Sequence, residues 1–525
     1  MSELREVGQR RPQAGIEARV RGGSTYTHDI SLPGMLYGAI LRSPHAHARI
    51  VSIDVSEARS LPGIHAVITA EHFGDRRYYH LGGSYSDRTP LAKDKVRFWG
   101  EEIAAIAADT LEIAERACSL IAVEYEVLPA AFSPEDALHA NAAEIHGAEN
   151  APGGRNVAIR FAADYGDANA ANAKPNFVLE DEFRHGIVAP CCMETNGTVA
   201  SFDSENETLQ LWTATQAPYF IRKEVAHVTG LDEKKVRIRS VEVGGGFGGK
   251  SKVCEQEALA AMLSIKARRP VKITLNRRDE FVSGKTDHAK RIRIRTTVSE
   301  DGRILNRNVS VQIDNGAYTA YAPTYVGASR QRTTCLYRIE SAHYDCELVY
   351  TNKVPGGQYR GMGAPHTIWA IESHMDEIAA RLNIDPLAYR ISQANQPGDV
   401  TPLKWRISTC GLTDCLREAG RMIGWDEKRS HSKPLHGVGV ASMIHPSGGV
   451  IYQEGNFSNT RIELTAEGGV VVHTHAVRSD GALYDYTLAL KNRFLRNAPA
   501  PDRVLFDSRL ELTANALGMN GKRPR

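Results

Sequence analysis

The sequence predicts an α+β protein of several domains, because two kinds of apolar pattern follow each other along the chain. Residues 15 to about 130 combine short apolar runs typical of strands with one run that has helical spacing. From about residue 175, alternating runs are paired across short polar turns, which indicates antiparallel hairpins with helices packed against them. A chain of 525 residues has room for about two to four domains of ~100–200 residues each.

The first section is predicted to hold short strands, one longer helix and then a linker. The strands are expected at "MLYGAILRS", "ARIVSIDV", "HAVITA", "EEIAAIAA" and "AVEYEV", and the helix at "TLEIAERACSLIA". The stretch that follows is rich in Ala, Gly, Pro and Asn over residues 133–158. We therefore expect a linker or a long surface loop over residues 133–170.

Hairpins and helices are predicted after this linker. The two hairpins are "TVASFDSENETLQLWTAT" and "RIRIRTTVSEDGRILNRNVSVQID". Helices are expected at about 219–229, 254–267 and 368–382, and Asp385 with Pro386 has the form of an N-cap and a first helical residue. A third section from about residue 410 shows the helix "TDCLREAGRMIG" and the hairpin "TRIELTAEGGVVVHTHAV".

The composition is that of an ordinary soluble globular protein. Hydrophobic residues make up 42% and charged residues 24%, and the formal net charge of +2 gives no reason to expect a nucleic-acid partner. The N-terminal stretch lacks the apolar core of a signal peptide, and no run approaches the ~18 apolar residues of a membrane span. The expected location is the cytoplasm.

Neither the cysteines nor the histidines predict a metal site of their own. The eight cysteines include no C-x-x-C pair, and Cys410 and Cys415 have the first spacing of an iron–sulfur run without the further cysteine it needs. His45 and His47 would share one face of a strand, but no third ligand accompanies them. We expect buried thiols and an ordinary histidine pair.

A glycine-rich segment, "VEVGGGFGGKSKVCEQEALAAML", is the strongest local motif. Residues 244–251 fit the P-loop pattern G-x-x-x-x-G-K-[ST], and residues 244–249 also fit the dinucleotide pattern G-x-G-x-x-G. The segment lies between an alternating strand pattern and a helical pattern, and backbone N–H groups at such a helix start can bind an anion. A tight glycine turn without a ligand is the structural alternative.

Neither nucleotide interpretation has the context it needs. The next strand, "PVKITLNRR", ends in Asn and Arg, whereas a dinucleotide fold needs an acidic residue there to hold the ribose. A P-loop enzyme needs a mainly parallel sheet and an Asp for Mg²⁺, whereas the neighbours here are predicted hairpins. Phe247 also stands inside the loop, where small residues normally line the phosphates.

An ordered set of motifs indicates a different relationship. The set comprises "GGSTYTHDISLPGMLYGAILRSPHAHARI", "LAKDKVRFWGEEIAAIAAD", "VEYEVLP", "WTATQAP", "VGGGFGGK", "VPGGQYRGMGAPHTIWAIESHMDEIA" and "DPLAYR". Over about residues 15–475 the chain resembles the molybdopterin-binding large subunit of the xanthine dehydrogenase and aldehyde oxidase family, the molybdenum hydroxylases. The resemblance implies a hammerhead domain at 1–132, a first molybdopterin-binding domain at 171–400 and the start of a second at 401–525.

The resemblance implies roles for particular residues. Gln216 would hydrogen-bond an oxygen on molybdenum, and Phe247 and Arg360 would contact the ligands of the metal. An amide NH₂ suits an oxo group, and a guanidinium brings a fixed positive fork. The loop glycines that would let the backbone approach the cofactor are Gly245, Gly246 and Gly248. Apart from the resemblance, Gln216 fits a turn at a strand end and Arg360 fits a surface ion pair.

The family's reaction hydroxylates a carbon atom with water as the oxygen source, and the cofactor performs the difficult step. The resemblance implies a molybdenum–molybdopterin cytosine dinucleotide cofactor and a small-molecule substrate that is aromatic, heterocyclic or an aldehyde. Because this chain has no cluster motif, iron–sulfur clusters and FAD are expected on partner subunits. A P-loop nucleotide-binding protein remains the alternative from a different functional class.

Three departures from the family pattern bear on substrate and activity. Ser251 stands where purine-oxidising members have Glu, which disfavours xanthine, and Met362 stands where many members have Phe. Residues 332–361 look most like the large subunit of 4-hydroxybenzoyl-CoA reductase, whose relatives remove a hydroxyl group. After about residue 475 the resemblance stops, without a Gly-Gln-Gly loop or the general-base Glu, because Glu454 and Glu467 stand in other motifs. Either a second chain supplies the missing half, or the chain is truncated or frameshifted and inactive.

Overall fold

The computed structural model describes residues 16–78, 86–167, 175–239, 241–251, 255–320, 322–431 and 433–445, together with three C-terminal strands. The chain groups into two compact units. Unit 1 holds the residues up to 128, residues 189–285 and the C-terminal strands, and unit 2 holds residues 129–188 and 286–448.

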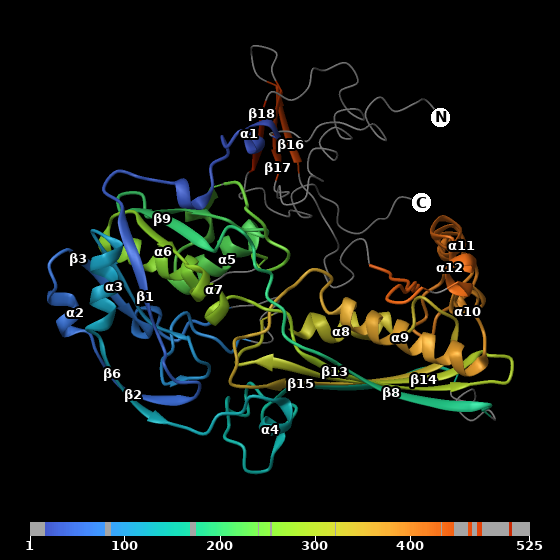
Figure 1. Ribbon diagram of the computed structural model, residues 1–525. Coiled ribbons are helices and arrows are strands. Elements are labelled where there is room, and N and C mark those ends of the chain that lie inside the picture. Colours follow the sequence, from blue (N-terminus) through green and yellow to red (C-terminus); the bar gives the residue numbers. More distant parts are fainter. Residues whose placement is uncertain are drawn as a thin grey trace, which may run out of the picture. The chain divides into compact units, whose positions relative to one another are not determined.

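Unit 1 is built on a seven-stranded mixed sheet with the order β11-β10-β9-β12-β1-β5-β3 (Figure 1). The first part of the unit contributes β1 (Leu36–Arg42), β3 (Ile64–Thr69) and β5 (Glu102–Ala108). The second part contributes β9 (Gly197–Asp203), β10 (Thr208–Thr213), β11 (Val236–Arg239) and β12 (Val271–Thr274). Parallel pairing of β1 with β12 joins the two parts into one sheet.

Helices cover both faces of this sheet. Alternate residues of β5 point to opposite faces, so Ala105 and Ala107 lie in the core with α5 (Pro218–Thr229) and α6 (Glu255–Ala267). Ala104 and Ile106 lie in the other core, with α2 (Ser56–Ser60) and α3 (Leu111–Ser119). The remaining α-helices and strands of this part of unit 1 are α1 (Ile16–Val20), β2 (Ala48–Asp54), β4 (Lys95–Val96), β6 (Ala122–Val127) and α7 (Arg277–Ser283).

Helix α6, which follows the glycine-rich segment, is buried on all sides from Glu255 to Ser264. Its sequence places Ala, Leu and Met around the whole helix, as expected for a helix without a solvent face. The buried charge of Glu255 is neutralised by Arg88 at 2.6 Å, and Arg88 also pairs with Glu102 at 2.6 Å. Since breaking such a buried pair is costly, this network fixes the start of α6.

Unit 2 is built on a five-stranded sheet with the order β7-β15-β14-β13-β8, and α8 and α9 lie along it (Figure 1). Its strands are β7 (Val157–Gly166), β8 (Phe177–His185), β13 (Lys290–Val298), β14 (Ile304–Gly316) and β15 (Ile339–Tyr350). Its helices are α4 (Pro134–Leu138), α8 (Ala322–Arg332), α9 (Ala364–Leu382), α10 (Pro386–Gln393), α11 (Leu412–Ile423) and α12 (Trp425–Ser430). Buried and partly exposed residues alternate along β14, so one face of the sheet is in the core.

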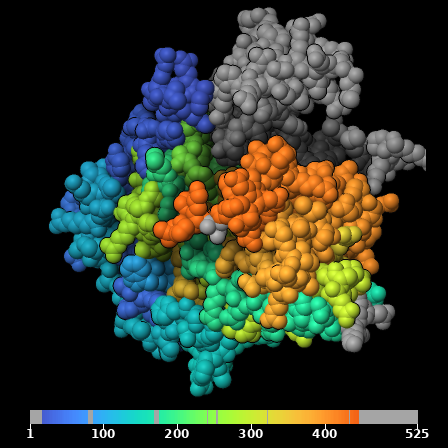
Figure 2. All heavy atoms as spheres, turned by 45° about the vertical axis from the view of Figure 1, so that its right-hand side comes forward, coloured from blue at the N-terminus to red at the C-terminus, as the bar shows by residue number. Residues whose placement is uncertain are grey.

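The last described part of unit 2, from about residue 410 to 445, lies at the molecular surface (orange in Figure 2). Helix α11 buries only Leu416 and Gly420. Beyond it, three strands form a separate small sheet: β16 (Thr460–Leu464), β17 (Val470–Thr474) and β18 (Arg503–Phe506). Among the described residues, no helix has both the length and the apolar character needed to cross a membrane.

Most of the predicted elements are confirmed. The five strands and the helix of the first section, the three helices near 219, 254 and 368, and the three hairpins all form. Asp385 caps α10 by accepting hydrogen bonds from Leu387 and Ala388, as its place before Pro386 predicts. The sheets with helices packed against them confirm the predicted α+β class.

Two local predictions are wrong. The stretch 133–170 is not a linker over its whole length, because it contains α4 and the ten-residue strand β7, which pairs with β15. The sheets are also not purely antiparallel, because β10 pairs in parallel with β11 and β14 with β15. Parallel pairing joins strands that are distant in sequence, and local hairpin signals carry no information about it. Glu454 and Glu467 lie outside the described residues.

Candidate functional site

The glycine-rich segment forms a strained turn between β11 and α6 of unit 1, and we name residues 244–251 the glycine loop. Gly245 and Gly248 both have φ of 97°, a conformation that only glycine adopts without strain. Phe247 lies between them with φ of 49°, and its side chain is 48% exposed. A bulky residue held in the left-handed region with an exposed side chain is typical of a functional site.

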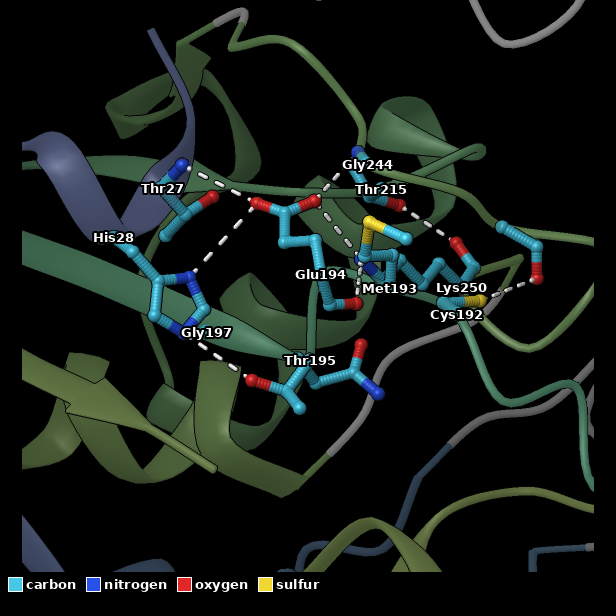
Figure 3. Close-up of polar contacts among 12 residues, drawn as sticks. Thr27, His28, Cys192, Met193, Glu194, Thr195, Gly197, Thr215, Gly244 and Lys250 are labelled. Atoms are coloured by element: carbon cyan, nitrogen blue, oxygen red, sulfur yellow. Dashed lines mark hydrogen bonds and ion pairs between the residues drawn. The ribbon is translucent and has the colours of Figure 1, made fainter. Parts of the chain in front are cut away.

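Lys250, at the end of the glycine loop, points into the protein and binds Glu194. Its side chain is 1% exposed, and its ammonium donates to the backbone oxygen of Glu194 at 2.9 Å and to carboxylate Oε2 at 3.0 Å (Figure 3). A P-loop lysine instead points out of its loop toward phosphates. Because the Lys250 ammonium is already bound inside the protein, the P-loop interpretation of this motif is wrong.

The carboxylate of Glu194 is the centre of this arrangement (Figure 3). Besides Lys250, it accepts hydrogen bonds from the backbone N–H of Gly244 at 2.7 Å and of Thr27 at 3.4 Å. His28 Nδ1 lies 4.0 Å from Oε1, and burial lowers the pKa of His28, which disfavours its cationic form. Glu194 is itself 7% exposed, so its negative charge is balanced mainly by Lys250.

Gln216, at the end of the β10 hairpin, lies against the glycine loop with a defined orientation. Its side-chain oxygen accepts a hydrogen bond from Gly248 N–H at 2.9 Å, and its own N–H donates to Lys250 O at 2.8 Å. In the described part of the chain, the Gln216 Nε2 group donates to no protein atom. Since the oxygen is committed to the loop, the NH₂ end is the one available to an acceptor outside the protein.

The loop offers backbone donors beside this amide. The N–H groups of Gly245, Gly246 and Phe247 have no backbone acceptor among the described residues. Cys192 donates its thiol to Gly246 O at 3.4 Å, and burial raises the pKa of that thiol, so it stays protonated. Unpaired N–H groups next to an amide donor form the kind of cradle that binds an oxyanion.

Gly246 is predicted to be indispensable for this geometry. A Cβ atom at position 246 would lie 2.5 Å from Gln216 Cδ, so Gly246→Ala must push the amide away from Gly248. We expect a loss of about 1–3 kcal/mol in stability, measured by urea unfolding. Gly437→Ala is the matched control, since nothing lies within 4 Å of its Cβ position. Equal effects of both changes would contradict this role for Gly246.

Ser251, predicted to contact substrate, is turned into the loop. Its hydroxyl donates to Gly248 O at 2.6 Å, and the residue is 9% exposed. This contact closes the turn, and the part of Ser251 in substrate binding stays a prediction.

Unit 2 carries the other predicted contacts on a second glycine-rich turn, residues 356–363, which we name the arginine turn. Arg360 is exposed in this turn. Within the described residues it forms no ion pair, so the alternative of a surface ion pair is not supported. Met362 has φ of 48°, a strained value for this side chain. Met362 N–H donates to Tyr359 O at 2.9 Å, which closes the turn.

The donor groups fit an anionic cofactor better than a protein-bound metal ion. The described residues include no group of three His, Cys, Asp or Glu side chains that could hold a metal ion. Unit 1 offers an oriented amide NH₂ and loop N–H groups, and unit 2 offers, on its own surface, a guanidinium without an ion pair among the described residues. Each of these groups suits oxo or phosphate oxygens.

Comparison with known proteins decides the family. Residues 21–129 match the family model "Aldehyde oxidase and xanthine dehydrogenase, a/b hammerhead domain", and residues 151–394 match "Molybdopterin cofactor-binding domain". The nicotinate dehydrogenase large molybdopterin subunit of Eubacterium barkeri is 32% identical over 394 residues, which are 75% of this chain and 90% of that protein. The chain belongs to the xanthine dehydrogenase family of molybdopterin-binding large subunits.

Other members of the xanthine dehydrogenase family are longer. A probable xanthine dehydrogenase subunit of Bacillus subtilis is 34% identical over 86% of this chain, but the match covers 60% of that protein. The solved structure of quinoline 2-oxidoreductase from Pseudomonas putida 86 matches with a TM-score of 0.86 and 27% identity, over 96% of this chain and 67% of that one. The chain therefore spans about 60% of the length of the first of these relatives.

The sequence motifs of the family did not reveal the residues that support the site. Glu194 and Cys192 contact the glycine loop directly, and neither stands in one of those motifs. Thr27 contacts Glu194 and does stand in a quoted motif, but the motif does not indicate this contact. One sequence signal could have indicated Cys192, namely the adjacent cysteines Cys191 and Cys192 before "METN". A buried thiol needs a hydrogen-bond acceptor, and a backbone oxygen of a glycine loop can provide one.

Proposed function

We propose that this chain is the molybdenum-cofactor-binding catalytic subunit of an oxidoreductase that hydroxylates a small aromatic, heterocyclic or aldehyde substrate with water as the oxygen source. The observation that carries the proposal is the orientation of Gln216, whose oxygen is held by Gly248 while its NH₂ group is left for an external acceptor. Family membership makes an oxygen atom of the molybdenum cofactor the fitting acceptor.

The residues of this chain would bind and orient, and the bound cofactor would supply the oxygen transfer and accept two electrons. Gln216 would donate to a cofactor oxygen, and the N–H groups of Gly245, Gly246 and Phe247 would bind further oxygens of the same group. The exposed ring of Phe247 would exclude water from this face. Arg360 would add a positive charge toward the anionic group.

The finer features of the complex are part of the same proposal. The cofactor would be the cytosine dinucleotide form, and iron–sulfur clusters and FAD would lie on partner subunits in the cytoplasm. A second chain would supply the rest of the molybdopterin-binding surface, including the general base. The Eubacterium barkeri relative supports this arrangement, because this chain spans 90% of that large subunit.

Substrate selection would involve Met362 and the surroundings of Ser251. Met362 is flexible and polarisable, so it can pack against rings of different shape. Nicotinate, quinoline and nicotine, substrates named for relatives of this chain, are nitrogen heterocycles, and we propose this class for the first substrate screen. Reductive removal of a phenolic hydroxyl is the second candidate, supported by the resemblance of residues 332–361.

The deciding experiment is metal analysis of the complex purified gently from its native host. We expect near-stoichiometric molybdenum, cytosine nucleotide released on acid treatment, and co-purifying iron–sulfur, flavin and C-terminal molybdopterin subunits. The same complex with Gly437→Ala is expected to keep its metal, whereas Gly246→Ala should not. Absence of molybdenum and of partner chains from the wild-type preparation would refute the proposal and support an inactive homologue.

A further inference from the structure

A buried lysine lies beneath the arginine turn, and no carboxylate of the described residues pairs with it. Lys290, the first residue of β13, is 3% exposed. Its ammonium donates to Gly363 O at 3.1 Å and lies 5.0 Å from the centre of the Tyr325 ring. Asp287 is bound to His366 Nε2 at 3.0 Å. Burial lowers the pKa of Lys290 to about 8, so the lysine is mostly charged at neutral pH.

A second buried side chain supports the other end of the same turn. His288 is 1% exposed, and neither of its ring nitrogens has a hydrogen-bond partner in the described structure. Its ring lies 4.4 Å from that of Tyr325, and a Cβ on Gly356 would lie 2.3 Å from it. Burial lowers the pKa of His288 to about 3, so the imidazole is neutral and acts by shape.

The turn between these supports is strained and tightly held. Tyr359 N–H donates to Tyr325 Oη at 3.0 Å. A Cβ on Gly363 would lie 2.5 Å from Lys290 Nζ and 2.6 Å from Tyr325 Cδ1, so only glycine allows this approach. Met362, one residue earlier, has φ of 48° and depends on its surroundings to stay there.

A purely structural role does not explain a charged residue at this place. The Lys290 ammonium is attracted by Asp287, but within the described structure Asp287 is paired with His366 and forms no ion pair with the lysine. Burying an ammonium in this way costs stability, and an apolar side chain of similar size would fill the space at lower cost. What the ammonium adds is one directed, charge-assisted bond to the carbonyl that ends the turn.

We propose that Lys290 is a positioning residue, which fixes Arg360 and Met362 in one conformation by holding the carbonyl of Gly363. Its importance for the cofactor rests on the proposed function, but its effect on the turn does not. His288 lies against Gly356 at the start of the turn, and Tyr325 accepts the hydrogen bond from Tyr359 N–H in its middle.

The test is hydrogen–deuterium exchange of the peptide that contains residues 356–364, measured in the purified complex with and without the change Lys290→Met. We expect exchange at these amides to become about tenfold faster, the effect of losing one charge-assisted hydrogen bond, while the rest of unit 2 is unchanged. The melting temperature is expected to stay the same or rise, because an unpaired buried charge has been removed. Molybdenum retention should fall in the same variant.

Three further variants keep the test decisive. Lys290→Gln keeps a donor without the charge and should leave exchange closer to wild type than Lys290→Met does. Tyr325→Phe removes the acceptor for Tyr359 N–H and should loosen the turn even if the lysine variants fail to fold. Arg295→Met removes a half-exposed cation from the same strand and should change nothing in the turn.

The outcomes separate the two proposals. Unchanged exchange in Lys290→Met, or faster exchange throughout unit 2 with a lower melting temperature, would overturn the positioning role. A loosened turn in a protein that never contains molybdenum would leave that role standing and refute the proposed function. A Lys290→Met protein that contains molybdenum and has an unchanged turn would refute the positioning role and leave the proposed function standing.

Discussion

Lys250→Met is expected to empty the cofactor site and to destabilise unit 1 by about 3–5 kcal/mol, because it leaves the Glu194 carboxylate buried without its cation. The Lys250 ammonium also donates to the backbone oxygen of Glu194. Because the Glu194 carboxylate accepts from Gly244 N–H, its displacement would loosen the start of the glycine loop as well as its end. If about 3 kcal/mol of this loss falls on the loop, cofactor affinity should drop on the order of a hundredfold. Molybdenum content and the urea midpoint measure the two effects.

The control for this prediction is Lys235→Met. Lys235 pairs with Glu207 on the surface of unit 1, where the two side chains are 39% and 68% exposed, so its loss should cost less than about 1 kcal/mol. The double change Lys250→Met with Glu194→Gln removes both charges and should recover part of the stability without restoring the metal. A Lys250→Met protein with normal metal content and stability would contradict the pinning role.

Gln216→Glu is expected to abolish turnover and leave the fold nearly intact. The new carboxylate can still accept the hydrogen bond from Gly248 N–H, so the loop keeps its contact. The NH₂ donor is lost, however, and a negative charge takes its place where we propose that the cofactor oxygen binds. Loss of one such donor costs about 10²–10³ in turnover, and like-charge repulsion adds to it. Steady-state kinetics on the complex and molybdenum analysis give the result.

The matched control is Gln210→Glu on the same hairpin. Gln210 accepts a hydrogen bond from Arg239 at 2.8 Å on the surface of β10, so the new carboxylate should be neutral or mildly stabilising. The urea midpoint of Gln216→Glu should lie within about 1 kcal/mol of wild type. A variant that turns over at the normal rate would show that the amide donor has no part in catalysis.

Much of the local structure could be predicted because it depends on short-range patterns. The alternation in β13 and β14, the spacing of α3 and the Asp385 cap all act within a few residues. The order of the motifs was enough to indicate the family and to select Gln216 and Arg360. The strand β7 was missed although Val157, Ile159 and Phe161 alternate as in a strand, because the Ala-, Gly-, Pro- and Asn-rich residues before it indicated a loop.

What the sequence determined by itself was therefore most of the element types and the family, and it proposed candidate residues for the site. Only the tertiary structure decided that β1 pairs with β12, which merges segments on either side of residues 129–188 into one sheet. It also decided that Lys250 turns inward to Glu194, which makes a P-loop-like motif into a pinned loop without an exposed lysine. The β1–β12 pairing and the Lys250–Glu194 contact each join residues more than 50 positions apart in the sequence. The direction of the Lys250 side chain is set by its attraction to a buried carboxylate, and local residue spacing does not encode that contact.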